Sequence, residues 1–234
     1  MEHILNYRQN DVSNNIIIFD TKRADVNGDG VAENIYLTGR RETTGIVASN
    51  IRVDVENGKT YHINLKVNKG YNPKLFVGDF TKDGIDDIFI SIESGNTGRE
   101  SYFYIYSFVD NEANRVFDFE QFNSEHQYDV NYKDNYIVEV KGLFSDFKQN
   151  INISNRGDYL KNLYNSDGKL INSMKGMVSP IIELRPIFSN GTYNLQAIQR
   201  IIGYYNADTL GMIVTPLRFD RTKNAFVSNT PYLI

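Results

Sequence analysis

Alternating apolar and polar positions predict β-strands along most of this chain, and the strands fall into four groups. Their apolar positions are rich in β-branched and aromatic residues, the types that sheets favour. In the first two groups, the expected strands cover residues 15–19, 34–38, 50–55 and 61–67, then 74–77, 88–92, 102–108 and 116–122. In the last two groups, they cover residues 128–132, 136–140 and 148–154, then 181–187, 195–202, 212–219 and 225–228.

Two local signals refine this pattern. Asn57-Gly58 lies between two alternating runs, and Asn-Gly in that position predicts a tight hairpin. Around residues 158–164 the spacing becomes helical, because Leu160 and Leu163 are three residues apart and Asp158 is a suitable N-cap.

Two acidic loops interrupt the strand pattern, and both have the spacing of a calcium-binding loop. Each places oxygen-bearing side chains at loop positions 1, 3, 5 and 9, a main-chain carbonyl at position 7, and glycine (Gly30 or Gly84) at position 6. The expected ligands are Asp25, Asn27, Asp29, the Val31 carbonyl and Glu33 in the first loop, and Asp79, Thr81, Asp83, the Ile85 carbonyl and Asp87 in the second.

Calcium suits these loops because it accepts about 6–8 oxygen ligands in a flexible geometry, whereas Mg²⁺ prefers to keep its waters in a strict octahedron. Three carboxylates in each loop would repel one another without a cation. The alternative is that both loops are ordinary solvated turns, since Asp, Asn and Gly are common in turns for backbone reasons. The sequence therefore predicts two Ca²⁺ sites, and Thr81 is the weakest of their ligands.

The residues after the loops exclude an EF-hand. Position 12 is Tyr36 in the first loop and Ile90 in the second, where an EF-hand needs a bidentate carboxylate followed by a helix. A dockerin repeat fails for the same reason. Both loops lead into strand-like segments, so the predicted unit is strand, calcium loop, strand.

The interval from Asp25 to Asp79, 79 − 25 = 54 residues, indicates a repeat. The two intact copies cover about residues 20–70 and 74–122. A degenerate third copy, at about 181–228, aligns Asn190-Gly191 with loop positions 5 and 6. Pro186 and Phe188 would occupy its positions 1 and 3, where they offer no side-chain oxygen, so no metal is expected there.

Residues 25–37 and 77–92 resemble the FG-GAP/VCBS-type repeat proteins of bacteria, whose blades carry Asp-rich calcium loops. The resemblance implies a β-propeller that serves in adhesion, in ligand binding or as an accessory module. This chain has only two intact loops and is too short for seven blades. We therefore expect one all-β domain over residues 1–234, a small propeller-like array of about four blades. A β-sandwich is the alternative.

Composition narrows the function classes. A net charge of −4 and a pI near 5.4 give no sign of nucleic-acid binding, and the absence of cysteine excludes disulfides, thiolate nucleophiles and thiolate zinc sites. No apolar run reaches the roughly 20 residues of a transmembrane helix. Residues Met1–Arg8 lack the layout of a signal peptide. The resemblance and the availability of calcium favour an extracellular location or a cell or spore surface.

The remaining motifs have simpler interpretations. Residues 110–118 match the oxygen spacing of a calcium loop but lack the glycine at position 6, which favours a hairpin turn. Arg156-Gly157-Asp158 is the tripeptide that integrins recognise, but it is better explained as the start of a helix. His3, His62 and His126 are far apart in the sequence. There is no nucleophile elbow, phosphate loop or zinc signature.

These observations predict a calcium-binding structural or ligand-binding module of the adhesion type, without intrinsic catalysis. Its ligand would be an unknown protein or glycan. The alternative is a hydrolase of glycans or phosphate esters whose site lies on the blade loops.

Overall fold

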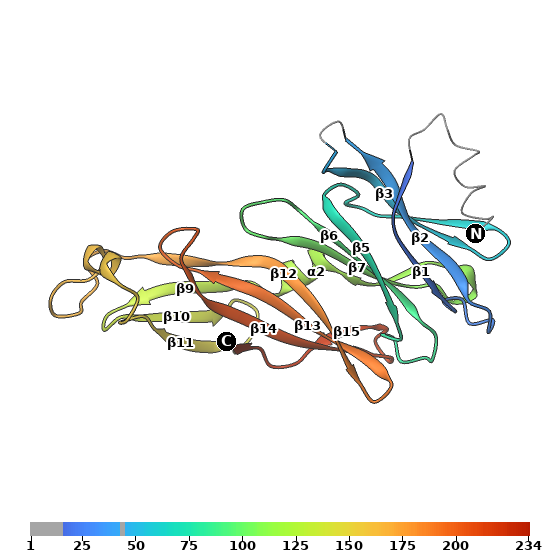
Figure 1. Cartoon of the computed structure of the whole chain (residues 1–234). Helices are drawn as coiled ribbons and strands as arrows, with labels where there is room; N and C mark the ends of the chain where they lie inside the picture. Colours follow the sequence, from blue (N-terminus) through green and yellow to red (C-terminus); the bar gives the residue numbers. More distant parts are fainter. Residues whose placement is uncertain (1–15, 43–44) are drawn as a thin grey trace. The chain divides into compact units, whose positions relative to one another are not determined.

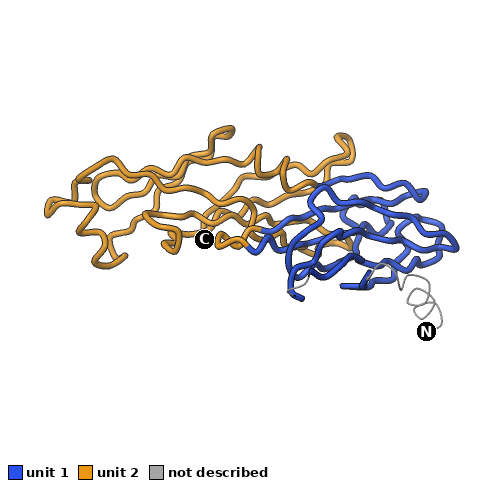
Figure 2. The backbone as a smooth tube through the Cα atoms, turned by 90° about the horizontal axis from the view of Figure 1, so that it is seen from above, with its two compact units in different colours: residues 1–95, 101–117 blue, residues 96–100, 118–234 orange. Residues whose placement is uncertain are grey.

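The computed structural model describes residues 16–42 and 45–234, and within these ranges antiparallel strands form three sheets. The fold is all-β, as expected. The chain divides into two compact units (Figure 2): residues up to 95 with 101–117 form unit 1, and residues 96–100 with 118–234 form unit 2. The single all-β domain expected over residues 1–234 stays a prediction. The expected strand start at Asn15 and the Met1–Arg8 segment lie outside the described residues.

Unit 1 contains two four-stranded meanders, each with its strands in chain order (Figure 1). The first comprises β1 (Ile17–Ala24), β2 (Glu33–Arg41), β3 (Ala48–Glu56) and β4 (Thr60–Asn64). The second comprises β5 (Tyr71–Gly78), β6 (Asp87–Glu93), β7 (Ser101–Ser107) and β8 (Asn114–Asp118), with a 3-10 turn, η1 (Val109–Asn111), before β8. The predicted Asn57-Gly58 hairpin joins β3 to β4, where Glu56 pairs with Thr60.

The core of unit 1 lies along the second and third strands of each meander. Ile35 and Leu37 in β2, and Ile88 and Ile90 in β6, are fully buried. The two meanders are joined at their first strands, because the Asp20 carboxylate accepts a hydrogen bond of 2.8 Å from the Leu75 main-chain N–H.

One fully buried carboxylate, Asp54 of β3, is held by three side chains. It accepts hydrogen bonds from the Thr38 hydroxyl (2.8 Å) and from His62 Nδ1 (2.6 Å), and it forms an ion pair of 2.8 Å with Arg52 Nε. A buried carboxylate needs such partners, because removing it from water is unfavourable.

Unit 2 contains one eight-stranded sheet, in the order β11-β10-β9-β12-β13-β14-β15, with β16 also paired to β14. Its strands are β9 (Tyr128–Lys133), β10 (Ile137–Gly142), β11 (Lys148–Asn152), β12 (Lys175–Ser189), β13 (Thr192–Ile202), β14 (Thr209–Asp220), β15 (Ala225–Ser228) and β16 (Tyr232–Leu233). The start of β12 pairs with β9 and the rest of it pairs with β13. The third and fourth predicted strand groups thus share one sheet, and a four-bladed array is not confirmed.

The strand expected at residues 116–122 is only partly correct, because β8 ends at Asp118 and helix α2 (Phe119–Glu125) follows. The Asp118 carboxylate caps the helix by accepting the Glu120 N–H at 2.8 Å. Phe119 and Phe122, three residues apart, are both buried. A helix is therefore indicated by the spacing of Phe119 and Phe122 after the capping Asp118. The alternating pattern of the preceding strand hid this signal.

The helical spacing near residue 160 forms a 3-10 helix, η2 (Asp158–Asn162). Leu160 and Leu163 are buried, as their spacing indicated. The prediction that Asp158 is its N-cap is wrong: Gly157 occupies that position, and Asp158 forms an exposed ion pair of 2.8 Å with Lys161.

The proposed third repeat has no loop between its first two strands. Asn190 and Gly191 form a two-residue turn with φ angles of 54° and 83°, which directly joins β12 to β13 at the Ser189–Thr192 pair. Two positive φ angles are typical of a type I′ hairpin. Pro186 and Phe188, aligned with loop positions 1 and 3, lie inside β12.

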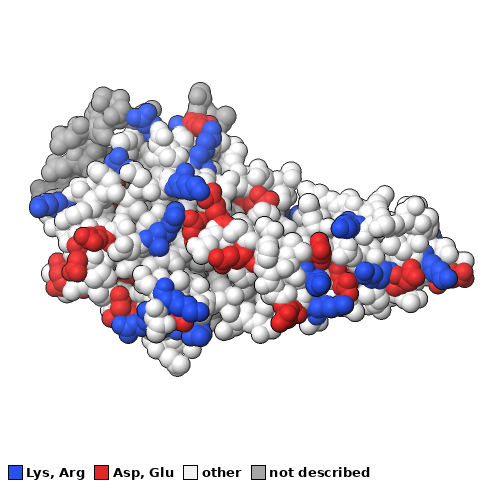
Figure 3. Space-filling model, turned by 180° about the vertical axis from the view of Figure 1, so that it is seen from behind, with Lys and Arg blue, Asp and Glu red and all other residues white. Residues whose placement is uncertain are grey.

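Two surface observations complete the fold. Among the described residues, no helix is long and apolar enough to cross a membrane. On the face shown in Figure 3, basic and acidic side chains alternate, and no continuous basic area is visible.

Candidate metal centre

Both predicted loops lie in unit 1, and each joins the first two strands of a four-stranded meander. The first loop runs from Asp25 to Glu33 between β1 and β2, and the second from Asp79 to Asp87 between β5 and β6. The predicted arrangement of strand, loop, strand is therefore present twice.

The two loops share one plan of hydrogen bonds at position 1. The carboxylate of Asp25 accepts the N–H groups of Gly28 (2.8 Å) and Gly30 (2.9 Å), at positions 4 and 6. The carboxylate of Asp79 likewise accepts the N–H groups of Lys82 (2.6 Å) and Gly84 (3.3 Å). Each loop therefore folds around its first carboxylate.

Position 4 has left-handed backbone geometry in both loops, with φ of 86° at Gly28 and 64° at Lys82. Position 6 is also left-handed, with φ of 84° at Gly30 and 90° at Gly84, which is the role that the sequence assigned to these glycines. The requirement at position 4 was missed, because a lysine there carries no glycine signal.

Position 5 also repeats. Asp29 Oδ1 accepts the N–H of Val31 at 2.8 Å, and Asp83 Oδ1 accepts the N–H of Ile85 at 2.9 Å. Such contacts between a side chain and the main chain two residues later are Asx turns. They stabilise the loop whether or not a cation is bound.

The carboxylates at position 9 are the buried members of the set, with Glu33 and Asp87 each 2% exposed. Each accepts the N–H at position 2 of its own loop: Val26 donates to Glu33 Oε2 at 2.9 Å, and Phe80 donates to Asp87 Oδ2 at 2.8 Å. Val26 and Phe80 are themselves fully buried. Position 9 therefore ties each loop to the core of unit 1.

The two buried carboxylates differ in how their second oxygens are satisfied. Glu33 Oε1 is buried and has no hydrogen-bond partner. Asp87 Oδ1 accepts only a long bond of 3.4 Å from the Thr81 hydroxyl, and burial raises the pKa of Asp87 to about 7 despite its hydrogen bonds from Phe80 and Thr81. Both loops thus contain a buried carboxylate oxygen with spare capacity to accept a cation or a proton.

The loops lie against each other, which the sequence did not indicate. Ile85 packs on Gly28 so closely that a Cβ added at Gly28 would be 2.6 Å from Ile85 Cδ1. The carboxyl of Asp86 has a raised pKa, through burial and through the nearby charges of Asp79 and Asp25. Carboxylates from both loops therefore influence one another.

The turn at η1 also reaches the first loop. The Asp110 main-chain N–H donates to the Asn27 carbonyl at 3.1 Å, and Asn111 Oδ1 accepts from Asn27 Nδ2 (3.3 Å) and Asn57 Nδ2 (2.6 Å). The acidic segment after residue 110, predicted as a hairpin turn, does join β7 to β8. It also holds Asn27, at position 3 of the first loop, through these hydrogen bonds.

As the structure stands, no three His, Cys, Asp or Glu side chains converge as metal ligands in the described residues. The carboxylate oxygens at positions 1 and 5 are instead directed at main-chain N–H groups of their own loops. The donor set nevertheless fits a hard cation, since every predicted side-chain ligand offers oxygen and Glu33 Oε1 has no other partner.

Comparison with known proteins identified a relative along nearly the whole chain. The uncharacterized protein YybI of Bacillus subtilis (strain 168) is 34% identical over 236 residues, covering 98% of this chain and 89% of the relative. The sequence model of the YybI C-terminal domain matches residues 126–231, which lie within unit 2. No solved structure matches.

Proposed function

The chain belongs to the YybI family, and we propose that it is a calcium-binding structural or ligand-binding module without intrinsic catalysis. The observation that carries the proposal is the repeated loop: the same main-chain donors serve position 1, position 5 and position 9 in both copies. In the first loop, Oε1 of the buried Glu33 carboxylate has no hydrogen-bond partner. A divalent cation would satisfy it and neutralise the acidic side chains around it.

The ligands in this proposal are those of the repeated loops. Asp25, Asn27, Asp29, the Val31 carbonyl and Glu33 would hold one Ca²⁺, and Asp79, Thr81, Asp83, the Ile85 carbonyl and Asp87 would hold the other. The bound ions would supply charge neutralisation and would fix the connection between the first two strands of each meander.

The two meanders also support a propeller-like organisation as part of the proposal. A four-stranded meander with an acidic loop after its first strand resembles one blade of an FG-GAP/VCBS-type protein. We extend the likeness only to the two meanders of unit 1. Loops of modest charge bind calcium at roughly 0.1–1 mM in extracellular modules, so an extracellular or surface location suits the proposed sites.

Calorimetric titration of the metal-free full chain tests the proposal directly. Calcium should bind at up to two sites and should raise the melting temperature, since a ligand that binds only the native state stabilises it by about 2.7 kcal/mol at one hundred times Kd. Asp83→Ala should remove most of the contribution of the second loop. Asp167→Ala, in an exposed turn of unit 2, is the matched control.

Absence of heat at millimolar calcium, with equal melting temperatures in calcium and in chelator, would show that the loops are only turns. A hydrolase remains the second candidate, favoured by one observation: Glu125 and Asp146 line the same cavity in unit 2. A panel of glycans and phosphate esters would reveal turnover, and its loss in Glu125→Gln would establish the enzyme.

A further inference from the structure

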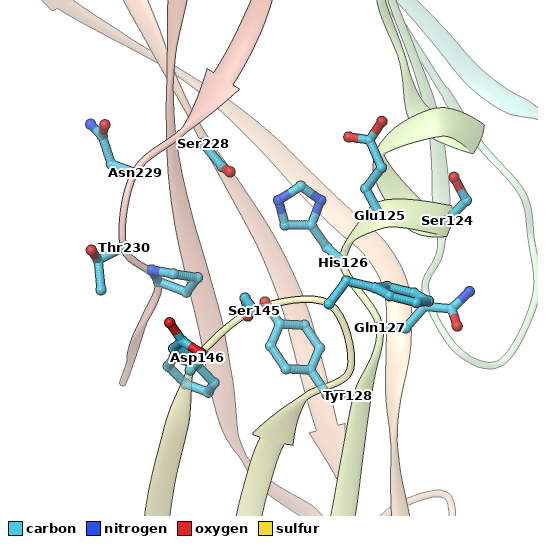
Figure 4. A pocket seen from close by; sticks show the side chains of 13 residues that line it. Ser124, Glu125, His126, Gln127, Tyr128, Ser145, Asp146, Ser228, Asn229 and Thr230 are labelled. Atoms are coloured by element: carbon cyan, nitrogen blue, oxygen red, sulfur yellow. The ribbon is translucent and has the colours of Figure 1, made fainter.

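A cavity of about 750 Å³ lies in unit 2. Its walls come from three segments far apart in the sequence: 124–128 at the end of α2 and start of β9, 144–147 between β10 and β11, and 228–231 from the last residue of β15 onward (Figure 4). Its volume falls within the range of pockets that take small molecules.

The cavity wall carries two carboxylates, Glu125 and Asp146, and no lysine or arginine. Anionic ligands such as phosphate esters or acidic sugars would meet uncompensated negative charge there. Apart from the His126 imidazole, the remaining polar side chains are hydroxyls and amides, including those of Ser228, Asn229 and Thr230. Such groups can both donate and accept hydrogen bonds, so the wall is suited to an uncharged ligand rich in hydroxyls.

His126 presents a hydrogen-bond acceptor to this cavity. Its Nδ1 lies 3.0 Å from the Phe122 carbonyl, which can only accept, so Nδ1 carries the proton and Nε2 is left as the acceptor. The ring stacks on Phe122 with centroids 4.1 Å apart, and Figure 4 shows the imidazole directed toward Ser228. Burial lowers the pKa of His126, which favours the neutral ring.

The position of His126 is also fixed from behind, because Gln199 Nε2 donates to its main-chain carbonyl at 3.1 Å. The His126 ring is held by stacking and by one hydrogen bond, and its main chain is held by another, so the side chain is in place before a ligand arrives. Such preorganisation favours binding.

An aromatic side chain stands at the rim of the cavity. Phe144, in the turn between β10 and β11, is 70% exposed, and the preceding Leu143 is 47% exposed. Apolar side chains exposed beside a cavity often mark a binding surface. The apolar C–H face of a sugar ring can cover an aromatic ring while its hydroxyls reach polar groups such as those on this wall.

We propose that this cavity binds a neutral glycan, with one sugar ring stacked on Phe144 and its hydroxyls bonded to His126 Nε2 and the Glu125 and Asp146 carboxylates. The proposal rests on the binding role proposed above and names its ligand class. It places glycan recognition in unit 2, apart from the calcium loops of unit 1.

The test measures binding of defined tetrasaccharides to the full chain by calorimetry and by saturation-transfer NMR. The panel comprises cellotetraose, maltotetraose and chitotetraose as neutral probes, a heparin tetrasaccharide as the anionic probe, and a neutral tetrapeptide. At least one neutral sugar should bind, and the heparin probe and the peptide should not. Phe144→Ala should weaken that binding about tenfold.

Phe188→Ala is the matched control, because Phe188 is 64% exposed in the same unit but does not line the cavity. It should leave the affinity unchanged. His126→Gln tests the proposed hydrogen bond inside the cavity. This variant should weaken sugar binding although Phe144 is unchanged. Circular dichroism checks that the variant is folded. Equal losses in Phe144→Ala and Phe188→Ala, binding of only the anionic probe or the peptide, or no binding by any neutral sugar would overturn the proposal.

All titrations are repeated in calcium and in chelator, which separates this proposal from the calcium proposal. Sugar binding that persists in chelator supports the unit 2 site even where no calcium binds. Calcium binding without sugar binding supports only the loops and overturns the glycan site.

Discussion

The main-chain N–H of Asp86 donates a hydrogen bond of 3.2 Å to the main-chain carbonyl of Asp25, and this bond joins the two acidic loops. Ile85, whose carbonyl is a proposed ligand, precedes the donor and packs against Gly28 of the first loop. We therefore expect a change of conformation in one loop to act on the other through main-chain atoms.

We expect calcium binding at the two loops to be coupled. Asp29→Ala removes a ligand of the first loop only, yet it should also weaken calcium binding by the second loop about fivefold, at the low end of typical coupling energies. Two-site calorimetry of wild type and variant measures this. Asp167→Ala is the control, and an unchanged affinity at the second loop would show that the loops act independently.

Glu33→Gln should have opposite effects on the metal-free and calcium-bound protein. The amide oxygen can still accept the Val26 N–H, and the substitution removes the negative charge of a buried carboxylate, one of whose oxygens has no partner. In chelator, the free energy of unfolding should therefore rise, by about 1 kcal/mol, whereas calcium affinity should fall. Urea denaturation and calcium titration check the two signs.

The exposed Glu183→Gln serves as the control for Glu33→Gln, because Glu183 pairs with Arg185 on the surface of unit 2. A loss of stability in chelator on changing Glu33 would mean that its second oxygen already has a favourable environment without a metal.

Asp87 should make the metal-free protein less stable as pH rises from about 4 to 7. Its pKa is about 7 in the folded state against 3.8 for the ordinary group. Between these values the folded chain holds a proton that the unfolded chain has lost, so the free energy of unfolding falls with pH, by up to about 1.4 kcal/mol per pH unit. Below pH 3.8 the stabilisation from the protonated Asp87 carboxyl is fully present.

Urea denaturation in chelator at pH 5 and pH 8 measures the effect of Asp87. Asp87→Asn retains an oxygen for the Phe80 and Thr81 N–H groups and should abolish this share of the pH dependence. Calcium favours the ionised carboxylate, so affinity at the second loop should increase as pH rises through 7. If the free energy of unfolding of Asp87→Asn varied with pH as in the wild type, Asp87 would not be the cause of that pH dependence.

Asp54→Ala should destabilise unit 1 by about 3 kcal/mol, because it leaves Arg52, His62 and Thr38 without their shared buried acceptor. The measurement is urea denaturation followed by circular dichroism. The exposed Asp167→Ala should change stability by less than about 0.5 kcal/mol. A similarly small effect at Asp54 would mean that water replaces the carboxylate.

Sequence patterns predicted those parts of the fold that depend on neighbours along the chain. The strand after Asp87, the Asn57-Gly58 hairpin and the left-handed glycines Gly30 and Gly84 all follow from local alternation or local backbone geometry. Helix α2 was missed although Asp118, Phe119 and Phe122 carry a signal, because the preceding alternation could be extended through them.

The remaining features depend on contacts between distant segments, for which one sequence contains no periodic signal. The packing of Ile85 on Gly28, the support from Asn111, and the pairing of Gly176 with Val130 belong to this class. So does the unit 2 cavity, whose three walls are scattered in the sequence. The metal ligands and the two calcium ions remain predictions.

The order of strands within the sheets also has a consequence for how the chain folds. Every strand pair in the two meanders of unit 1 joins neighbours in sequence, whereas the sheet of unit 2 must pair β9 with β12 across β10, β11 and η2. Short loops close at a smaller loss of entropy and so form sooner. During synthesis the meanders leave the ribosome first. We expect them to fold before the later strands of the unit 2 sheet have been synthesised.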